Sequence, residues 1–153
     1  MIEIANQGDG VTAAGLAALE KEFGAKLPED YLEFLSLNDG GRPTPGTVDI
    51  EGLPGSPTDV QEFFGMHGAS GSSNILWNLE VIRDRLPNFH ALPIACDSGG
   101  SLFCLTPSQA GKSEVVYCDM PGSSFYKATQ DISVYKVAPD FRSFMNKIRN
   151  WVH

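Results

Sequence analysis

The sequence predicts an α+β domain with a mostly antiparallel sheet, and three observations lead to this prediction. Apolar residues recur with the period of a helix near both ends of the chain. Between these helical segments, short apolar runs of strand length are separated by turn residues. The chain has 153 residues, 42% of them hydrophobic, which suits one ordinary domain with a core of its own. We therefore expect residues 1–153 to form a single domain.

The first helix is expected over residues 12–23. Its apolar positions lie at i, i+3 and i+7 and so share one face: Leu16, Leu19 and Phe23. Thr12 is a suitable N-cap, and Gly24 supplies the left-handed residue that commonly ends a helix.

A second helix is expected to begin at residues 27–31 and to end at residues 38–41. Pro28 suits the first turn, where its missing N–H would have no partner in any case. The acids Glu29 and Asp30 favour the positive end of the helix. Its apolar stripe consists of Tyr31, Phe34 and Leu35.

The middle of the chain is rich in Gly, Pro and Ser. Residues 47–51 alternate between apolar and polar side chains, which indicates a half-exposed strand. Residues 52–73 are expected to form a long surface loop with one short element in it; loops of this length usually have a function or are mobile. A third helix is expected over residues 74–85, closed by Pro87.

The second half of the chain changes from helical spacing to strand spacing. Four strands are expected, over residues 92–97, 102–106, 115–118 and 132–137. A last helix is expected over residues 139–152, where apolar side chains recur at helical spacing from Phe141 to Val152.

The turn between the first two of these strands sets the positions of two cysteines. If Gly99 and Gly100 form a two-residue hairpin turn, Cys96 lies opposite Phe103, and Cys104 lies opposite Ala95. The two thiols then point to opposite sides of the sheet, so neither a disulfide nor a shared metal follows.

The charge of the chain disfavours some classes of binding partner. The net charge is −8, and it is unevenly spread: residues 1–50 carry −6, residues 51–100 carry −4 and residues 101–153 carry +2. A strongly acidic chain is repelled by phosphate backbones and anionic lipid, so we expect neither nucleic-acid nor membrane binding. No apolar run is long enough to span a membrane, and the first residues do not resemble an export signal. With three cysteines, an odd number, we expect reduced thiols and a cytoplasmic protein.

Motifs that could carry catalysis or bind a metal are incomplete. Gly111-Lys112-Ser113 lacks the glycine of a phosphate loop, because position 106 is Thr, and a strand rather than a helix follows; a hairpin turn is favoured. The cysteines form no C-x-x-C pair and are expected to be small buried hydrophobes. The three histidines and the serines of residues 68–73 show no nucleophile motif. We therefore expect no enzyme, no metal and no cofactor.

The turn at Asp97-Ser98-Gly99-Gly100 is the most interesting local feature. Two glycines after an apolar strand let the backbone approach a partner closely. A tight turn that only requires positive φ explains the same residues, and local chemistry favours that explanation.

Two stretches of the chain combine into a longer pattern. The first runs from Leu19-Glu20 through Gly24 to LPEDYLEFL at residues 27–35 and ends in NDGGRP at residues 38–43. The second is LPIACDSGG at residues 92–100, followed by the expected strand at 102–105 and by VVY at 115–117. In this order, and with Phe141 and Phe144 in the last helix, residues 16–150 resemble the SUKH superfamily. This group contains the Smi/Knr-type regulators of fungal cell-wall synthesis and many small bacterial proteins. Asp39 departs from the pattern, which more often has Asn directly before the glycines, and residues 52–73 cannot be aligned.

The resemblance implies an α+β domain without known catalytic residues. Bacterial members are commonly immunity proteins that bind a cognate toxin, often a nuclease, and others are general protein-interaction modules. The matching positions are expected to be mainly structural: Pro28, Tyr31, Gly40, Gly41, Ile94, Gly99 and Gly100. Asp97 and its turn are the matching positions that could belong to a binding cleft.

The charge and the resemblance together suggest a non-catalytic protein-binding domain, with a toxin as the expected partner. An acidic face could speed encounter with a basic nuclease toxin and cover its nucleic-acid surface. The expected contacts are Asp39, Asp49, Glu51, Asp59 and Glu62, with Asp97 as a further candidate. The alternative is a regulatory interaction module without a toxin partner. A small enzyme is disfavoured, because the sequence offers no nucleophile with a base beside it.

Overall fold

A computed structural model describes residues 2–5, 9–67, 70–120 and 132–151. Its main sheet is antiparallel and has the strand order β5-β6-β7-β8-β9. These strands span Glu62–Phe63, Leu92–Cys96, Leu102–Leu105, Val115–Asp119 and Ser133–Ala138. Two small ribbons, β1-β2 and β3-β4, pair Glu3–Ala5 with Arg42–Thr44 and Thr47–Val48 with Thr58–Asp59. The α+β class predicted from the sequence is confirmed.

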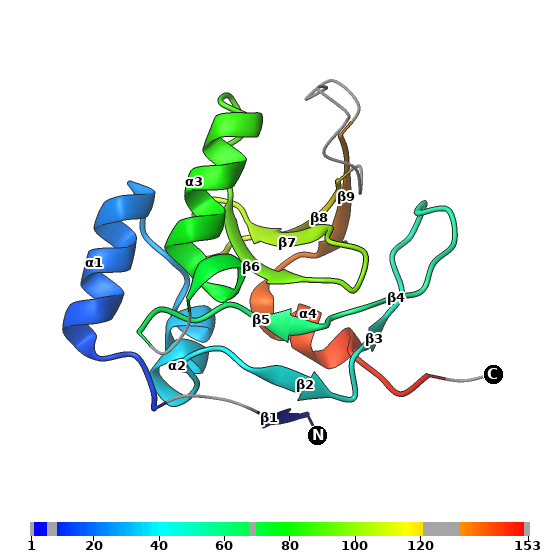
Figure 1. Ribbon diagram of the computed structural model, residues 1–153, viewed down its shortest axis with the longest axis horizontal. Helices are drawn as coiled ribbons and strands as arrows, with labels where there is room; N and C mark the ends of the chain where they lie inside the picture. The colour runs from blue at the N-terminus through cyan, green and yellow to red at the C-terminus, as the bar shows by residue number, and fades with distance from the viewer. Residues whose placement is uncertain (1, 6–8, 68–69, 121–131, 152–153) are drawn as a thin grey trace.

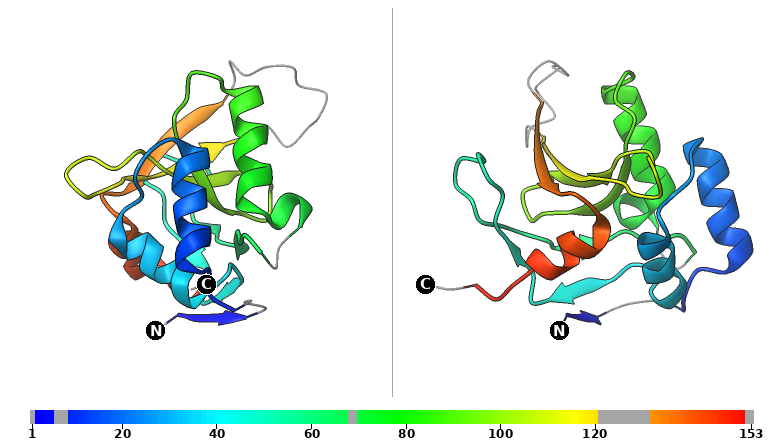
Figure 2. Two further views of the ribbon diagram at one scale, coloured as in Figure 1. Left: turned by 90° about the vertical axis from the view of Figure 1, so that its left-hand side faces the viewer. Right: turned by 180° about the vertical axis from the view of Figure 1, so that it is seen from behind.

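The described residues form four α-helices beside the sheet. They span Ala13–Phe23 (α1), Glu29–Leu37 (α2), Ile75–Arg85 (α3) and Phe141–Lys147 (α4), and a 3-10 turn, η1, spans Gly71–Ser73. Helix α3 packs against β6, α1 lies outside α3, and α4 contacts α2 and β9 (Figures 1 and 2). The β3-β4 ribbon and the loop between its strands lie at the opposite end of the molecule from α1 (Figures 1 and 2).

The ends of α1 have the predicted capping residues, and side chains that were not predicted as caps begin α3 and α4. The Thr12 hydroxyl accepts a hydrogen bond from the backbone N–H of Gly15, and Gly24 has φ +81° after α1. Asn74 caps α3 by accepting the N–H of Trp77, and Asp140 caps α4 by accepting the N–H of Ser143.

An aromatic cluster forms the centre of the core and joins the helices to the sheet. The ring centroids of Tyr31 and Phe141 are 5.2 Å apart, which connects α2 with α4. Phe144 of α4 lies 5.3 Å from Phe103 of β7, and Phe103 lies 5.1 Å from Tyr117 of β8. Edge-to-face and tilted pairs of this kind add roughly 0.5–1.5 kcal/mol each beyond the burial of their area.

The last helix is shorter than predicted. It ends at Lys147, and Ile148 already has an extended backbone. The backbone of Arg149 instead pairs with Thr47 of β3 through N···O distances of 2.7 and 2.9 Å. The helix therefore does not reach Trp151, although the apolar spacing predicted it. The backbone N–H and C=O of Arg149, which a longer helix would use, are hydrogen-bonded to Thr47 instead.

The segment 52–73 holds more structure than the predicted loop with one short element. It contains β4, β5 and η1, and Phe63 and Phe64 are fully buried. The strand predicted over 47–51 is limited to Thr47–Val48, with Thr47 buried rather than exposed.

The register of the β6-β7 hairpin also differs from the prediction. Cys96 lies opposite Leu102, and Cys104 lies opposite Pro93, with an irregularity between Pro93 and Ala95. The turn spans residues 97–101 instead of two glycines, because the N–H of Asp97 donates to Ser101 O at 3.0 Å.

Candidate functional site

Asp97 is a buried carboxylate with four internal hydrogen bonds. One oxygen, Oδ1, accepts the backbone N–H groups of Gly99 and Ser101 at 3.0 and 2.8 Å. The other, Oδ2, accepts the hydroxyls of Thr58 at 2.9 Å and Tyr117 at 2.5 Å. Asp97 thereby fixes its own turn and ties it to β4 and β8. Its oxygens are occupied inside the fold, and its negative charge remains as a local field.

The phenol of Tyr117 is a donor rather than a base. Burial, and then the hydrogen bond to Asp97, raises the pKa of Tyr117 to about 12. A phenol with this pKa stays protonated near neutral pH, so it keeps donating to Asp97 and does not act as a general base.

Asp59 of β4 holds the outer side of the same turn. Its Oδ1 accepts the N–H of Ser98 at 2.9 Å, and its Oδ2 accepts the Ser98 hydroxyl. Together with the Thr58–Asp97 bond, these contacts fasten the β3-β4 ribbon to the turn at residues 97–101.

Asp49 and Glu51 lie in the connection between β3 and β4, and both are exposed. Asp49 forms a two-pronged ion pair with Arg149, whose Nε and Nη2 lie 2.7 and 2.8 Å from the carboxylate oxygens. These hydrogen bonds hold the pKa of Asp49 below its usual value.

Glu62 and Asp39 occupy different environments although both were predicted contacts. Glu62 of β5 is half-buried, and its Oε1 accepts the Ser73 hydroxyl at 2.8 Å. Asp39 is 6% exposed, and it accepts the backbone N–H groups of Met66 and His67 at 2.5 and 2.9 Å. The structure thus brings Asp49, Glu51, Asp59 and Glu62 to the surface and places Asp39 and Asp97 inside.

A cleft of about 320 Å³ lies beside the Asp97 turn, and we call it the Trp77 cleft. Its lining includes Glu62, Trp77, Val81, Arg85, Cys96 and Ser98. Trp77 is 46% exposed, because it lies off the buried stripe of α3. That offset is visible in the sequence, where Trp77 does not share the helical spacing of Ile75, Leu79 and Ile82, although Trp77 was not among the predicted contacts.

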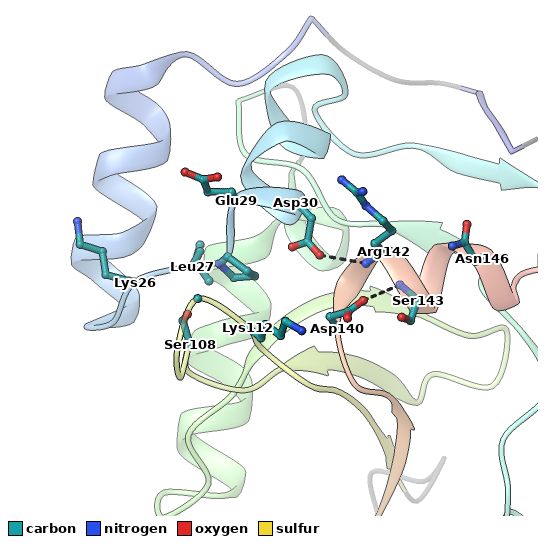
Figure 3. Close-up of a pocket in the computed structure, with 12 residues that line it drawn as sticks. Lys26, Leu27, Glu29, Asp30, Ser108, Lys112, Asp140, Arg142, Ser143 and Asn146 are labelled. Atoms are coloured by element: carbon teal, nitrogen blue, oxygen red, sulfur yellow. Dashed lines mark hydrogen bonds between the residues drawn. The ribbon is translucent and has the colours of Figure 1, made fainter.

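A larger hollow of about 790 Å³ lies between the start of α2, the β7-β8 loop and α4 (Figure 3). Three cations and three acids line it: Lys26, Lys112, Arg142, Glu29, Asp30 and Asp140. The formal charges of these six side chains therefore balance. Pro28, one of the family-motif positions, lies in its wall.

Two of these acids are engaged with backbone groups of α4 (Figure 3). The Arg142 N–H donates to Asp30 Oδ2 at 3.1 Å, and the Ser143 N–H donates to Asp140 Oδ1 at 2.7 Å. The hydrogen bonds from Ser143, helped by Lys112 and Arg142, lower the pKa of Asp140. These acids serve to start α4 and to attach it to α2.

The side chains weighed for catalysis do not form a reactive set. Cys104 and Cys118 are buried side by side on β7 and β8, and burial, with Cys118 nearby, raises the pKa of the Cys104 thiol. Burial also raises the pKa of Cys96 to about 11. Within the described ranges, no group of three His, Cys, Asp or Glu residues could hold a metal ion. His67 and His90 are exposed, and His153 lies outside the described residues.

The segment Gly111-Lys112-Ser113 belongs to a hairpin turn, as predicted. Gln109 and Lys112 exchange backbone hydrogen bonds of 2.8 and 3.0 Å, and strand β8 follows. No helix N-terminus faces this turn from the residues that come next, so a phosphate loop is absent from this part of the described chain.

The residues of the family motif mostly occupy positions that matter for folding, either in the core or in tight backbone turns. Tyr31, Pro28 and Ile94 are buried. Gly40 has φ +80°, and a Cβ built on it would lie 2.8 Å from both Phe63 O and Gly65 N. That distance is shorter than real Cβ contacts, so only glycine fits where the chain after α2 passes β5. Gly41 and Gly100 also have positive φ, whereas Gly99 is not among the positive-φ glycines.

Comparison with protein families gives a match over most of the chain. The model of the SMI1 / KNR4 family (SUKH-1) matches residues 10–147. No match is found among curated proteins or among solved structures. None of the helices in the described residues is both long and apolar enough to cross a membrane.

Proposed function

This chain belongs to the SMI1 / KNR4 family (SUKH-1), and we propose that it is a single, non-catalytic protein-binding domain. Family membership is compatible with an immunity role or with a regulatory role. Of these two, we propose the immunity role: the protein binds and neutralises a cognate bacterial toxin whose surface is basic, such as a nuclease. The proposal includes a cytoplasmic location, where the three thiols would stay reduced.

The proposal rests mainly on one observation: the middle of the chain, residues 43–82, carries acidic side chains without basic ones. Residues 43–82 contain no lysine or arginine, and four of their acids lie at or near the β3-β4 ribbon and β5: Asp49, Glu51, Asp59 and Glu62. We call these four side chains the acidic face. Asp59 and Glu62 are held by hydrogen bonds, so their charges are fixed in position before a partner arrives.

A fixed array of carboxylates has a defined physical effect on a basic partner. It raises the rate of encounter and orients the partner, and the effect weakens as salt rises. On a nuclease toxin, the complementary basic surface is the one that binds nucleic acid. An acidic face that covers this surface blocks the toxin without any chemical step.

The proposed function involves no chemical reaction, and the side chains that could react lie in environments that fit this. The thiols of Cys96 and Cys104 have raised pKa values, which reduces the fraction of reactive thiolate. Asp97 has both oxygens occupied by donors within the fold. These features support a binding role rather than a catalytic one.

Affinity purification of the full chain from cells of its own source tests the proposal. The tagged protein should retain a protein with a strongly basic domain, and growth arrest caused by expressing that domain should be relieved by co-expression of this chain. A retained partner that is harmless when expressed alone would overturn the immunity role and support the regulatory alternative. Retention of no specific protein would overturn both.

A further inference from the structure

We propose that the Trp77 cleft receives an arginine side chain of the protein partner. The inference rests on the proposed function and adds one recognition element to it, because it states which side chain the partner inserts and where. Three features of the cleft lead to it: an exposed indole, a positioned carboxylate and the size of the hollow.

Trp77 contributes little to the core for a residue of its size. The α3 side chains that face the sheet, Ile75 and Leu79, are 0% and 3% exposed, whereas Trp77 is 46% exposed and lines the cleft. Tryptophan at a protein surface is enriched at binding hot spots, where its large rigid area is covered by a partner. Trp77 is therefore available to a partner without any rearrangement of α3.

The cleft combines this indole with negative charge. Glu62 lines it from β5, and the Ser73 hydroxyl at 2.8 Å fixes the orientation of its carboxylate. Asp97 also borders the cleft and adds a second carboxylate, although its oxygens are already occupied. Among the described residues that line the cleft, Arg85 is the opposing charge, so the two carboxylates outnumber it.

An arginine satisfies these groups better than other side chains. Its planar guanidinium can stack on an indole and donate to a carboxylate at the same time, which a lysine ammonium does less well. An apolar side chain would cover Glu62 without pairing it, and a buried unpaired carboxylate is costly. An acidic or phosphorylated side chain would be repelled by Glu62 and Asp97. A volume of about 320 Å³ suits one side chain and a short part of its backbone.

A short peptide pair tests the cleft directly. The probes are acetyl-Gly-Arg-Gly-amide and the same peptide with citrulline, which has the same shape without the charge. In ¹H–¹⁵N spectra of the full chain, the arginine peptide should shift the indole N–H signal of Trp77, and the citrulline peptide should bind at least about fivefold more weakly.

Two substitutions separate the cleft from general electrostatics. Glu62→Gln keeps an acceptor for Ser73 and should weaken arginine-peptide binding about fivefold, whereas Glu22→Gln on α1 removes the same charge elsewhere and should change it less than about twofold. Equal binding of the two peptides, an indole signal that does not move, or equal effects of the two substitutions would each overturn the inference.

Failure of this inference is distinguishable from failure of the proposed function. For a partner retained in the affinity purification, Trp77→Ala should weaken binding at least about tenfold, and Leu37→Ala, at another exposed apolar residue, should not. If the partner binds and the two alanine variants are equal, the cleft is wrong and the binding role stands. If no partner is retained, the binding role is wrong, and the peptide experiment still decides the cleft.

Discussion

Two tyrosines in the core differ in whether the phenolic hydroxyl has a hydrogen-bond partner. The Tyr117 hydroxyl donates to Asp97 at 2.5 Å, whereas the Tyr31 hydroxyl is fully buried and has no hydrogen-bond partner among the described residues. The ring of Tyr31 is nevertheless well packed, with Phe141 at 5.2 Å and Phe34 at 6.3 Å between centroids. The aromatic ring of Tyr31 stabilises the core, and its buried hydroxyl opposes that gain.

Replacing each tyrosine by phenylalanine should therefore have opposite effects. Tyr31→Phe removes an unsatisfied polar atom and should raise the free energy of unfolding by about 1 kcal/mol. Tyr117→Phe removes a donor from a buried carboxylate and should lower it by about 1–3 kcal/mol. Urea unfolding of both variants measures the difference, and a destabilising Tyr31→Phe would show that the hydroxyl has a partner in solution.

The same two phenols predict how stability depends on alkaline pH. Burial and the bond to Asp97 raise the pKa of Tyr117 to about 12, and burial, with the charge of Asp39, raises the pKa of Tyr31. An unfolded tyrosine titrates near 10. Because the folded values are higher, the contribution of both phenols is complete below pH 10 and begins to fall above it. The contribution of Tyr117 is lost as the pH rises through 12, whereas that of Tyr31 is still falling there.

Urea unfolding at a series of alkaline pH values tests whether stability falls as the pH rises. The free energy of unfolding should fall from pH 10 to 12, and the fall should be shallower in the double variant Tyr31→Phe, Tyr117→Phe. An identical slope in the variant would mean that other groups, and not these phenols, govern alkaline unfolding.

At the scale of elements, the residues that cap helices were predictable because their chemistry is local. Thr12 and Gly24 bound α1 as the sequence predicted, and Asn74 begins α3. The end of α4 was not predictable, because Arg149 pairs with Thr47, a residue about 100 positions earlier. The register of the β6-β7 hairpin was missed for a different reason: the side chain of Asp97 accepts the N–H groups of Gly99 and Ser101 and so holds a longer turn.

The β7-β8 turn contains one residue in a strained conformation. Ala110 has φ +53° and precedes Gly111 at φ +79°, and a two-residue hairpin turn with both central φ values positive favours Asn-Gly. Alanine adopts left-handed backbone angles only at a cost of about 1 kcal/mol.

Ala110→Asn should therefore stabilise the turn. We expect the free energy of unfolding to rise by about 0.5–1 kcal/mol, because asparagine tolerates the left-handed region better than alanine. Thermal and urea unfolding measure it, with Ala18→Asn on an exposed helical position of α1 as the control, where the change should be destabilising. A loss of stability in Ala110→Asn would contradict the turn geometry.

At the scale of the whole molecule, the sequence located the acidic region but not the role of each acid. Composition alone shows that residues 1–100 carry the negative charge. It does not show that Asp39 and Asp97 turn inward to accept backbone and hydroxyl donors, because those donors come from distant segments. Of the six predicted contacts, four remain at the surface, and one of these, Asp49, is paired with Arg149.

The β3-β4 ribbon, which carries part of the acidic face, is attached to the rest of the fold at two places. The β3-β4 ribbon is attached to the turn of the main sheet by Asp59 and to the C-terminal segment by Arg149. Helix α1 lies at the opposite end and provides a site for control substitutions (Figure 1). Equal changes in charge at the two ends of the molecule can therefore be compared. They distinguish an effect of the acidic face on partner binding from an effect of the net charge of the protein.

The association rate with the retained partner, measured against ionic strength, tests the central claim most directly. The variant Glu51→Lys, Glu62→Gln alters the acidic face, and Glu22→Lys, Glu33→Gln makes the same change in net charge on α1 and α2. The account predicts that the first variant associates about tenfold more slowly at low salt and loses most of its salt dependence, while the second stays within about twofold of the unmodified chain. Equal rates for the two variants, or rates that do not respond to salt, would contradict it.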